Sequence, residues 1–323
     1  MENTALVPIH PVLPAEHREL LQDLARESRA ASTWKAYQVD WRLWSEWAAQ
    51  QNAHALPADP AVVASYLGEL SETRKVSTLK RYLASISVMH TVKGETFDRK
   101  SPVLRTIMKG IGRRHHGKHR KVRPLMVDEF LSMLGEMSSQ RIADCRDAAL
   151  LALGLAMAAR RSELAGLDWM KRGGGTGVLE LTGRGARIVL YTSKTKQGEP
   201  DEIYIQPGRT LKAIRAWVQR VGITEGSPLF RGVTRWEHIN STRLHASTIA
   251  RTVKRRCEEM GLDAEHYSGH SLRAGMITTA FERGVPEWKI RLTCRHSEKS
   301  RELQGYNRPV QKRKHAVTTE LGL

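Results

Sequence analysis

A run of basic residues near residue 115 divides the chain into two halves with different hydrophobic patterns. Lys109 to Arg123 holds seven Lys or Arg, three His and no acid, with Pro124 just beyond it. Before this run, apolar residues recur every three or four positions, whereas after it helical patterns alternate with short β-like runs. The pattern predicts a flexible N-terminus over residues 1–15, a helical domain over 16–112, a basic linker over 113–124 and a mixed domain over 125–323.

The first half of the chain is predicted to be helical throughout. Its strongest segment begins at Ser32 or Thr33, either of which can cap a helix. The segment repeats large apolar residues at helical spacing, and we expect this stripe to lie in a core; it consists of Trp34, Tyr37, Trp41, Trp44 and Ala48. Asp59 followed by Pro60 is a typical helix start. The expected helices cover residues 14–28, 33–51, 59–70, 76–92 and 103–112.

The helix expected over residues 76–92 has an apolar face and a polar, basic one. Leu79, Leu83 and Ile86 recur at helical spacing, continued by Met89 or His90, and Ser85 lies on a polar face. A helix of this kind can lie in the major groove of DNA, although a purely structural helix is the alternative. Together with the linker, the candidate DNA-contacting residues are Thr78, Lys80, Arg81, Arg113, Arg114, Lys118, Arg120 and Lys121.

Charge favours a polyanionic partner. The formal net charge is +18 and the pI about 10.1, a bias typical of nucleic-acid-binding proteins but shared by ribosomal and membrane-surface proteins. The linker is either a solvated tether or a strap on a phosphate backbone, and the two are compatible. Its histidines do not predict a metal site, because HHGKH has no carboxylate or thiol nearby.

Cysteine usage and hydropathy indicate the cellular setting. The three cysteines, Cys145, Cys257 and Cys294, form no CxxC motif and are expected to be reduced thiols. No apolar run approaches the length of a membrane span, and no secretory signal is apparent at the N-terminus. We therefore expect a cytoplasmic protein, associated with the nucleoid, that folds without metal or disulfides.

The second half is predicted to be mainly helical with one small antiparallel sheet. Three strands are expected over residues 178–183, 187–193 and 202–206. The expected helices cover residues 127–136, 143–158, 162–167, 211–221, 246–260, 272–283, 287–292, 299–306 and 310–320.

The segment from residue 268 to 306 carries the strongest chemical signal. GHSLR places His270 and Arg273 one helical turn apart, His296 follows in CRHSEKS, and Tyr306 stands ten residues later. Arginine can donate two hydrogen bonds to two phosphate oxygens and keeps its charge, while a tyrosine can attack the phosphorus. The set predicts cleavage of a phosphodiester by Tyr306.

A second arginine stands upstream in AARRSEL. Either Arg160 or Arg161 could bind the same phosphate, with Glu163 behind it as an orienting carboxylate. A capped helix with solvated arginines is the structural alternative.

These ordered boxes, AARRSEL, GHSLRAG and RHSEKSRELQGY, resemble those of tyrosine recombinases of the phage-integrase family. The resemblance spans essentially the whole chain. It implies an N-terminal helical core-binding (SAM-like) domain followed by an α+β catalytic domain. By register it implies that the catalytic arginine is Arg160 and not Arg161, with Glu163 as the nearby acid.

The resemblance also assigns roles to a lysine in a β-hairpin turn and to residues of the third box, RHSEKSRELQGY. A lysine in a β-hairpin turn is implied as general acid, and Lys194 in SKTK is favoured over Lys196. His296 is implied as a donor to a phosphate oxygen or a support for the tyrosine. Arg295 stands where many members have glycine, which puts in doubt only the backbone of that turn. Cys294 is not expected to be a nucleophile.

The activity implied is site-specific recombination without a cofactor or metal. Tyr306 would form a 3′-phosphotyrosyl bond, and a 5′-hydroxyl from the partner duplex would reseal it through a Holliday junction. The implied partners are double-stranded DNA recombination sites and a homotetramer with a dimer on each site, in a simple Cre-like or Xer-like arrangement because about 15 residues precede the first helix. The last helix, over 310–320, would dock on a neighbouring protomer through Val310, Ala316, Val317 and Leu321.

Two alternatives stay open. A type IB topoisomerase uses nearly the same residues but relaxes DNA as a monomer. A non-enzymatic DNA-binding regulator would explain the charge and the helices.

Overall fold

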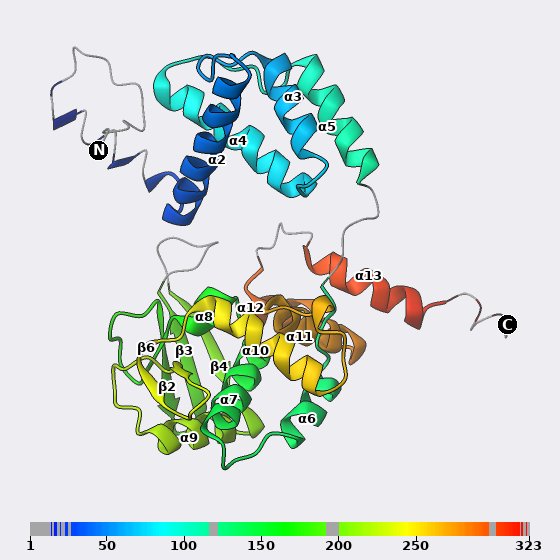
Figure 1. Cartoon of the computed structure of the whole chain (residues 1–323). Coiled ribbons are helices and arrows are strands. Elements are labelled where there is room, and N and C mark those ends of the chain that lie inside the picture. The colour runs from blue at the N-terminus through cyan, green and yellow to red at the C-terminus, as the bar shows by residue number, and fades with distance from the viewer. Residues whose placement is uncertain are drawn as a thin grey trace. The chain divides into compact units, whose positions relative to one another are not determined.

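The computed structural model divides the chain into two compact units, Met1–His119 and Arg120–Leu323 (Figure 1). The structure describes residues 27–115, 122–191, 200–296 and 302–316, with scattered single residues near both termini. The division falls within the basic run that separates the two hydrophobic patterns.

The described part of the first unit is a bundle of helices. They are α2 (Ala31–Gln50), α3 (Pro60–Leu70), α4 (Val76–Lys93) and α5 (Pro102–Arg114). The predicted start at Asp59 is confirmed, since its carboxylate accepts a hydrogen bond from the Ala61 amide at 2.6 Å. The predicted cap of α2 is wrong, because the helix begins at Ala31, after an N-cap residue, Ala30, whose side chain makes no capping bond. The helix expected over 14–28 lies largely outside the described residues.

Aromatic side chains fill the core of this unit. Trp44 and Ala48 are fully buried and Trp34 nearly so, as predicted for the stripe on α2, while Tyr37 and Trp41 are half-buried. The apolar face of α4 is buried as well. Ser85, expected on a polar face, is instead buried and donates to the Tyr82 carbonyl at 2.9 Å, because a helical hydroxyl can satisfy itself on the preceding turn.

Helix α5 ends later than the sequence predicts. It runs through Arg114, so Arg113 and Arg114 form its last turn and do not belong to an extended linker. Basic side chains at this end are favourable because they face the partial negative charge of the last carbonyls.

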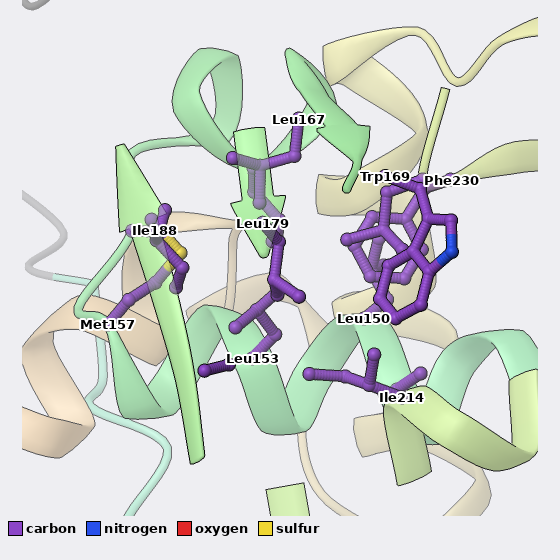
Figure 2. Packing of buried hydrophobic residues seen from close by; sticks show 14 of the residues in the cluster. Leu150, Leu153, Met157, Leu167, Trp169, Leu179, Ile188, Ile214 and Phe230 are labelled. Atoms are coloured by element: carbon purple, nitrogen blue, oxygen red, sulfur yellow. The ribbon is translucent and has the colours of Figure 1, made fainter. Parts of the chain in front are cut away.

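The second unit is built around one buried helix. Within it come α6 (Val127–Gly135), α7 (Ile142–Ala156) and α8 (Arg161–Ala165), and α7 is apolar on nearly all sides. A helix of this kind must be covered all round. Figure 2 shows Leu150, Leu153 and Met157 facing side chains of the neighbouring sheet and of a further helix.

The sheet beside α7 has four described strands, β1 (Leu167–Trp169), β2 (Gly177–Thr182), β3 (Gly185–Leu190) and β4 (Asp201–Ile205), in the order β1-β2-β3-β4. The predicted antiparallel sheet corresponds to β2, β3 and β4. Two features were not predicted: β1 joins β2 in parallel, and a second hairpin pairs β5 (Arg231–Val233) with β6 (Ile239–Arg243). β1 has three residues and is buried along its length, and β6 (INSTR) is half-exposed, so neither shows a clear alternation.

The remaining helices complete the unit. They are α9 (Arg209–Val221), α10 (Ala246–Glu259), a short 3-10 turn (Ala264–His266), α11 (His270–Glu282), α12 (Glu287–Cys294) and α13 (Glu302–Lys314). The two helices predicted over 299–306 and 310–320 are wrong in one respect, because α13 continues through Pro309 without a break. Proline removes one backbone hydrogen bond from a helix. Burial of Leu303 and Val310, on either side of it, offsets that loss.

Candidate active site

The C-terminal end of α7 is where the site begins. After the helix Ala158 adopts a left-handed backbone conformation (φ +46°), which turns the chain toward Arg160. Two guanidinium groups donate to the carbonyls exposed by this turn: Arg273 to Ala158 at 2.7 Å and Arg295 to Met157 at 3.0 Å. Cations are favourable at a helix C-terminus, so this end holds both arginines in fixed positions.

Arg160 and Glu163 are locked together at the start of α8. The Arg160 guanidinium donates to Oε1 of Glu163 at 2.7 Å, and the Arg160 amide donates to Oε2 at 2.8 Å. Burial would raise the pKa of Glu163, but the charge of Arg295 and the bonds from Arg160 lower it below its usual value. The carboxylate is therefore ionised and orients Arg160, whose side chain stays 23% exposed and open to a ligand.

Arg295 is the functional neighbour that the sequence did not predict. It follows α12 in a left-handed conformation (φ +55°), and its guanidinium reaches Glu163, Met157 and the Thr293 carbonyl. The sequence put in doubt only the backbone of this turn, whereas the side chain of Arg295 also takes part in the site. The available signal was an arginine at a position that favours glycine, which calls for a compensating role for its side chain.

Arg273 and His296 form the next contact. A guanidinium nitrogen of Arg273 lies 3.1 Å from Nε2 of His296, and the Arg273 side chain is almost completely buried. Burial and the charge of Arg273 lower the pKa of His296 to about 4, so the ring is neutral at pH 7. The same Nε2 lies 3.1 Å from the Glu302 carboxylate, and Nδ1 lies 2.9 Å from the Cys294 thiol.

Tyr306 and His270 meet across the site. The Tyr306 hydroxyl on α13 lies 2.9 Å from Nε2 of His270 on α11. Burial raises the pKa of Tyr306, whereas burial and the charges of Arg273 and Arg160 lower that of His270. A protonated phenol thus faces a neutral imidazole, which is the state in which the ring can accept its proton.

Helix α13 is packed on its own chain. Leu303 and Val310 are buried in a cluster with Ile277, Ile290 and Cys294, which fixes Tyr306 beside α11. Val310 was expected on a face that docks on a neighbouring protomer, and that expectation is wrong for this residue because it is 1% exposed. Of the other three positions, Ala316 is half-buried, Leu321 is exposed and Val317 lies outside the described residues.

The structure thus brings together six of the predicted residues from four elements: Arg160, Glu163, His270, Arg273, His296 and Tyr306. Figure 1 draws α8, α11 and α12 at one end of the second unit, where these residues lie. Lys194 and its alternative Lys196 fall outside the described residues. Tyr267, the other tyrosine close to GHSLR, is 1% exposed and packs in a core.

The predicted DNA-contacting residues have different surroundings. Thr78 is half-buried, Lys80 is exposed, and Arg81 is tied to the buried carboxylate of Asp40 by two bonds of 2.8 Å. At the end of α5, Arg114 pairs with Glu72 at 2.6 Å, while Arg113 is exposed. Lys118, Arg120 and Lys121 lie outside the described residues.

Neither a metal centre nor a membrane helix is seen in the described residues. No three His, Cys, Asp or Glu side chains among them are grouped to hold a metal ion. No helix in that part of the chain is long and apolar enough to cross a membrane.

Comparison with known proteins agrees with this geometry. The model of the phage integrase family matches residues 124–313, the region that holds every residue of the site. This chain belongs to the phage integrase family. A model of the phage integrase N-terminal SAM-like domain matches residues 18–93. The tyrosine-recombinase resemblance and the predicted fold class are both confirmed, and the chain is an enzyme of site-specific recombination.

Individual relatives cover most of the chain. An integrase/recombinase xerD homolog of Selenomonas ruminantium is 31% identical over 283 residues, which are 84% of this chain and 81% of that protein. The XerH site-specific recombinase bound to palindromic difH substrate has a TM-score of 0.65 at 14% identity, over 94% of this chain and 84% of that one. The Tn1549 transposon integrase in complex with transposon right end DNA has a TM-score of 0.57 at 13% identity, over 92% and 98%. Because the sequence identities are only 14% and 13%, the two structures support the fold of this chain and nothing further.

Proposed function

We propose that this integrase-family protein cleaves and rejoins DNA through a 3′-phosphotyrosyl intermediate on Tyr306. The observation that carries the proposal is the 2.9 Å contact between the Tyr306 hydroxyl and His270. It supports the proposal because a phenol lies beside a neutral imidazole, in a site where Arg273 also acts on both groups.

The first step is attack of the Tyr306 oxygen on the scissile phosphorus. The phenolic proton passes to His270, the new bond is O–P, and the bond to the 5′-oxygen breaks to release a 5′-hydroxyl. Arg160 and Arg273 would bind the non-bridging oxygens, whose charge increases in the transition state. Their orientation by Glu163 and by the end of α7 is in place before the substrate binds, so little reorganisation is needed.

The other partners of the reaction have narrower roles. His296, neutral and held at Nδ1, would donate to a non-bridging oxygen through Nε2. Lys194 would protonate the departing 5′-oxygen. In the second step the 5′-hydroxyl of the other duplex would give its proton to Lys194 and its oxygen would attack the phosphorus, while the bond to the Tyr306 oxygen breaks and His270 returns the phenolic proton. The bond energy is retained in this exchange, and the arginines and Lys194 supply the charge that a metal or cofactor would otherwise provide.

The proposed substrate is a pair of double-stranded recombination sites. The XerH and Tn1549 proteins are described in complexes with DNA, and the surplus of positive charge here suits the same partner. We further propose a homotetramer with a dimer on each site and a Holliday-junction intermediate. Thr78, Lys80, Arg113, Lys118, Arg120 and Lys121 remain proposed DNA contacts.

A nicked suicide duplex tests the proposal. Fragments spanning the DNA next to the protein's own gene are nicked so that the short leaving strand diffuses away, and the covalent adduct is collected by denaturing electrophoresis. Wild type should form an adduct that protease digestion reduces to a peptide containing Tyr306, and Tyr306→Phe should bind the duplex without forming one. An adduct formed equally by Tyr306→Phe would overturn the assignment. Relaxation of supercoiled plasmid without site preference would instead favour the topoisomerase alternative.

A further inference from the structure

Arg161, the residue after the proposed catalytic arginine, lies directly over the backbone of Gly269. A Cβ atom built on Gly269 would come within 2.4 Å of Cδ and 2.5 Å of Cγ of Arg161. Real Cβ atoms essentially never approach that closely. The absence of a side chain at Gly269 is therefore what lets the Arg161 stem cross from α8 to the start of α11, where His270 follows.

The guanidinium of Arg161 has no counter-charge in the described residues. It is exposed, and neither a hydrogen bond nor an ion pair joins it to any residue in that part of the chain. The nearest carboxylate on its own helix, Glu163, is already held by Arg160 and Arg295. Arg161 is close enough to His270 for its charge to help lower the pKa of that ring.

The surroundings of the Arg161 side chain favour an anion. Arg161 is the first residue of α8, and its stem lies beside the first turn of α11, so it stands near a helix end that carries partial positive charge. Arg160 and Arg273 add two full charges nearby. An anionic ligand that approaches His270 from the solvent side would meet Arg161 and relieve this repulsion.

We propose that Arg161 binds a backbone phosphate that flanks the scissile phosphate on the cleaved DNA strand. The inference rests on the proposed function, which puts the scissile phosphate between Arg160, Arg273 and His270. A strand held there presents its next phosphate outside the site, where Arg161 is exposed. Arginine suits this contact because its fork can bind two oxygens of one phosphate. Arg161 thus binds the flanking phosphate and positions the strand, whereas Arg160 and Arg273 bind the reacting phosphate.

Salt dependence of DNA binding tests the contact without requiring cleavage. The full chain carrying Tyr306→Phe is titrated with a 40-base-pair duplex of random sequence between about 50 and 200 mM salt. One lost phosphate contact should reduce the slope of log K against log salt by about 1. Arg161→Ala should show this reduction and bind about tenfold more weakly at low salt, as expected for one charge-assisted hydrogen-bonded contact. Arg161→Lys should keep the slope.

Arg215→Ala is the matched control, because Arg215 is exposed on α9, which Figure 1 draws at the other end of the unit. It removes the same charge and should leave the slope unchanged. The proposal would be overturned if Arg161→Ala had the same salt slope as the Tyr306→Phe parent. It would also be overturned if Arg161→Ala and Arg215→Ala reduced the slope equally.

Gly269→Ala provides a second variant that keeps the charge. Its methyl group must displace the Arg161 stem, so binding should weaken as in Arg161→Ala. In the Arg161→Ala background, Gly269→Ala has no arginine stem to displace and should not weaken duplex binding further. If the two substitutions weaken binding additively, the proposal is contradicted. Failure of wild type to form a covalent adduct would remove the proposed chemistry but leave these binding measurements to decide the phosphate contact.

Discussion

Arg295 and Glu163 form an ion pair in which each side chain is 4% exposed and which joins residues 132 positions apart. The carboxylate also holds the backbone and the guanidinium of Arg160. His296 follows Arg295 directly. One buried pair therefore fixes the relative positions of the first and third catalytic boxes.

Breaking this pair should destabilise the catalytic unit. Arg295→Gly removes one of the two arginines that pair with the buried Glu163 carboxylate, which costs about 3 kcal/mol, and relieves about 1 kcal/mol of left-handed backbone strain. The expected net loss is about 2 kcal/mol in the free energy of unfolding, measured by urea titration. Adding Glu163→Gln should recover part of that loss, because a neutral amide needs no counter-charge. A glycine variant as stable as wild type would show that the pair does not hold the unit together.

The contact between Tyr306 and His270 predicts the pH dependence of cleavage. The pKa of Tyr306 is raised, so the phenol is protonated at neutral pH and needs a base. Burial lowers the pKa of His270 from 6.5, so the ring is neutral at pH 7 and becomes charged only below pH 6.5. Adduct formation by wild type should stay high at pH 7 and fall as the pH drops below 6.5.

His270→Ala supplies the control for that profile. Loss of a general base slows reaction about 10²- to 10⁴-fold, and the acid limb of the profile should disappear with it. If the variant keeps the same limb at a lower rate, another group titrates and His270 is not the base.

Cys294 is expected to set the protonation of His296. Burial raises the pKa of the thiol, so it stays protonated and can donate to Nδ1 at 2.9 Å. The ring proton then resides on Nε2, where the Glu302 carboxylate at 3.1 Å, and the expected phosphate in a complex, can accept it. Cys294→Ala should bind DNA normally and form adduct about tenfold more slowly, a smaller loss than the roughly 10²- to 10⁴-fold expected when a catalytic group is removed outright. Cys294→Ser keeps a donor and should remain near wild type; equal losses in both variants would indicate a packing defect instead.

Much of the site could be predicted because its residues lie in short boxes whose internal spacing follows helical geometry. His270 and Arg273 needed only one turn of helix to share a face. Arg295 was missed because its partner Glu163 is distant in sequence, and no periodicity connects an αL residue after α12 with the first turn of α8. Strand β1 was missed for a similar reason: three buried residues carry no alternation, and only pairing with β2 makes them a strand.

Buried His90 makes the N-terminal unit sensitive to acid. Nε2 accepts from the Ala58 amide at 2.8 Å, and Nδ1 donates to the Ile86 carbonyl at 2.8 Å, so only the neutral ring satisfies both. Burial lowers its pKa from 6.5, and the stability it contributes is therefore present above pH 6.5 and lost as the pH falls below that value. The urea concentration at the unfolding midpoint of wild type should decrease as the pH is lowered from 7.5 to 5.5. In His90→Gln, which can still accept from Ala58, the midpoint should fall less; the same decline in both proteins would assign it to other groups.

Arg81 and Lys80, neighbours on α4, should separate stability from DNA binding. Arg81 was predicted to contact DNA, but its fork is engaged by Asp40, whose side chain is 1% exposed while that of Arg81 is 46% exposed. Removing the arginine leaves a buried carboxylate without its partner, so Arg81→Ala should lower the free energy of unfolding by about 2 kcal/mol, less than for a fully buried pair.

Lys80 is exposed and forms no ion pair in the described part of the chain, so Lys80→Ala should leave stability unchanged within about 0.5 kcal/mol. The same lysine variant should weaken duplex binding and reduce its salt slope by about 1. Both variants are measured by urea titration and by salt-dependent duplex binding. If Arg81→Ala keeps the stability of wild type and reduces the salt slope of binding, Arg81 contacts DNA after all.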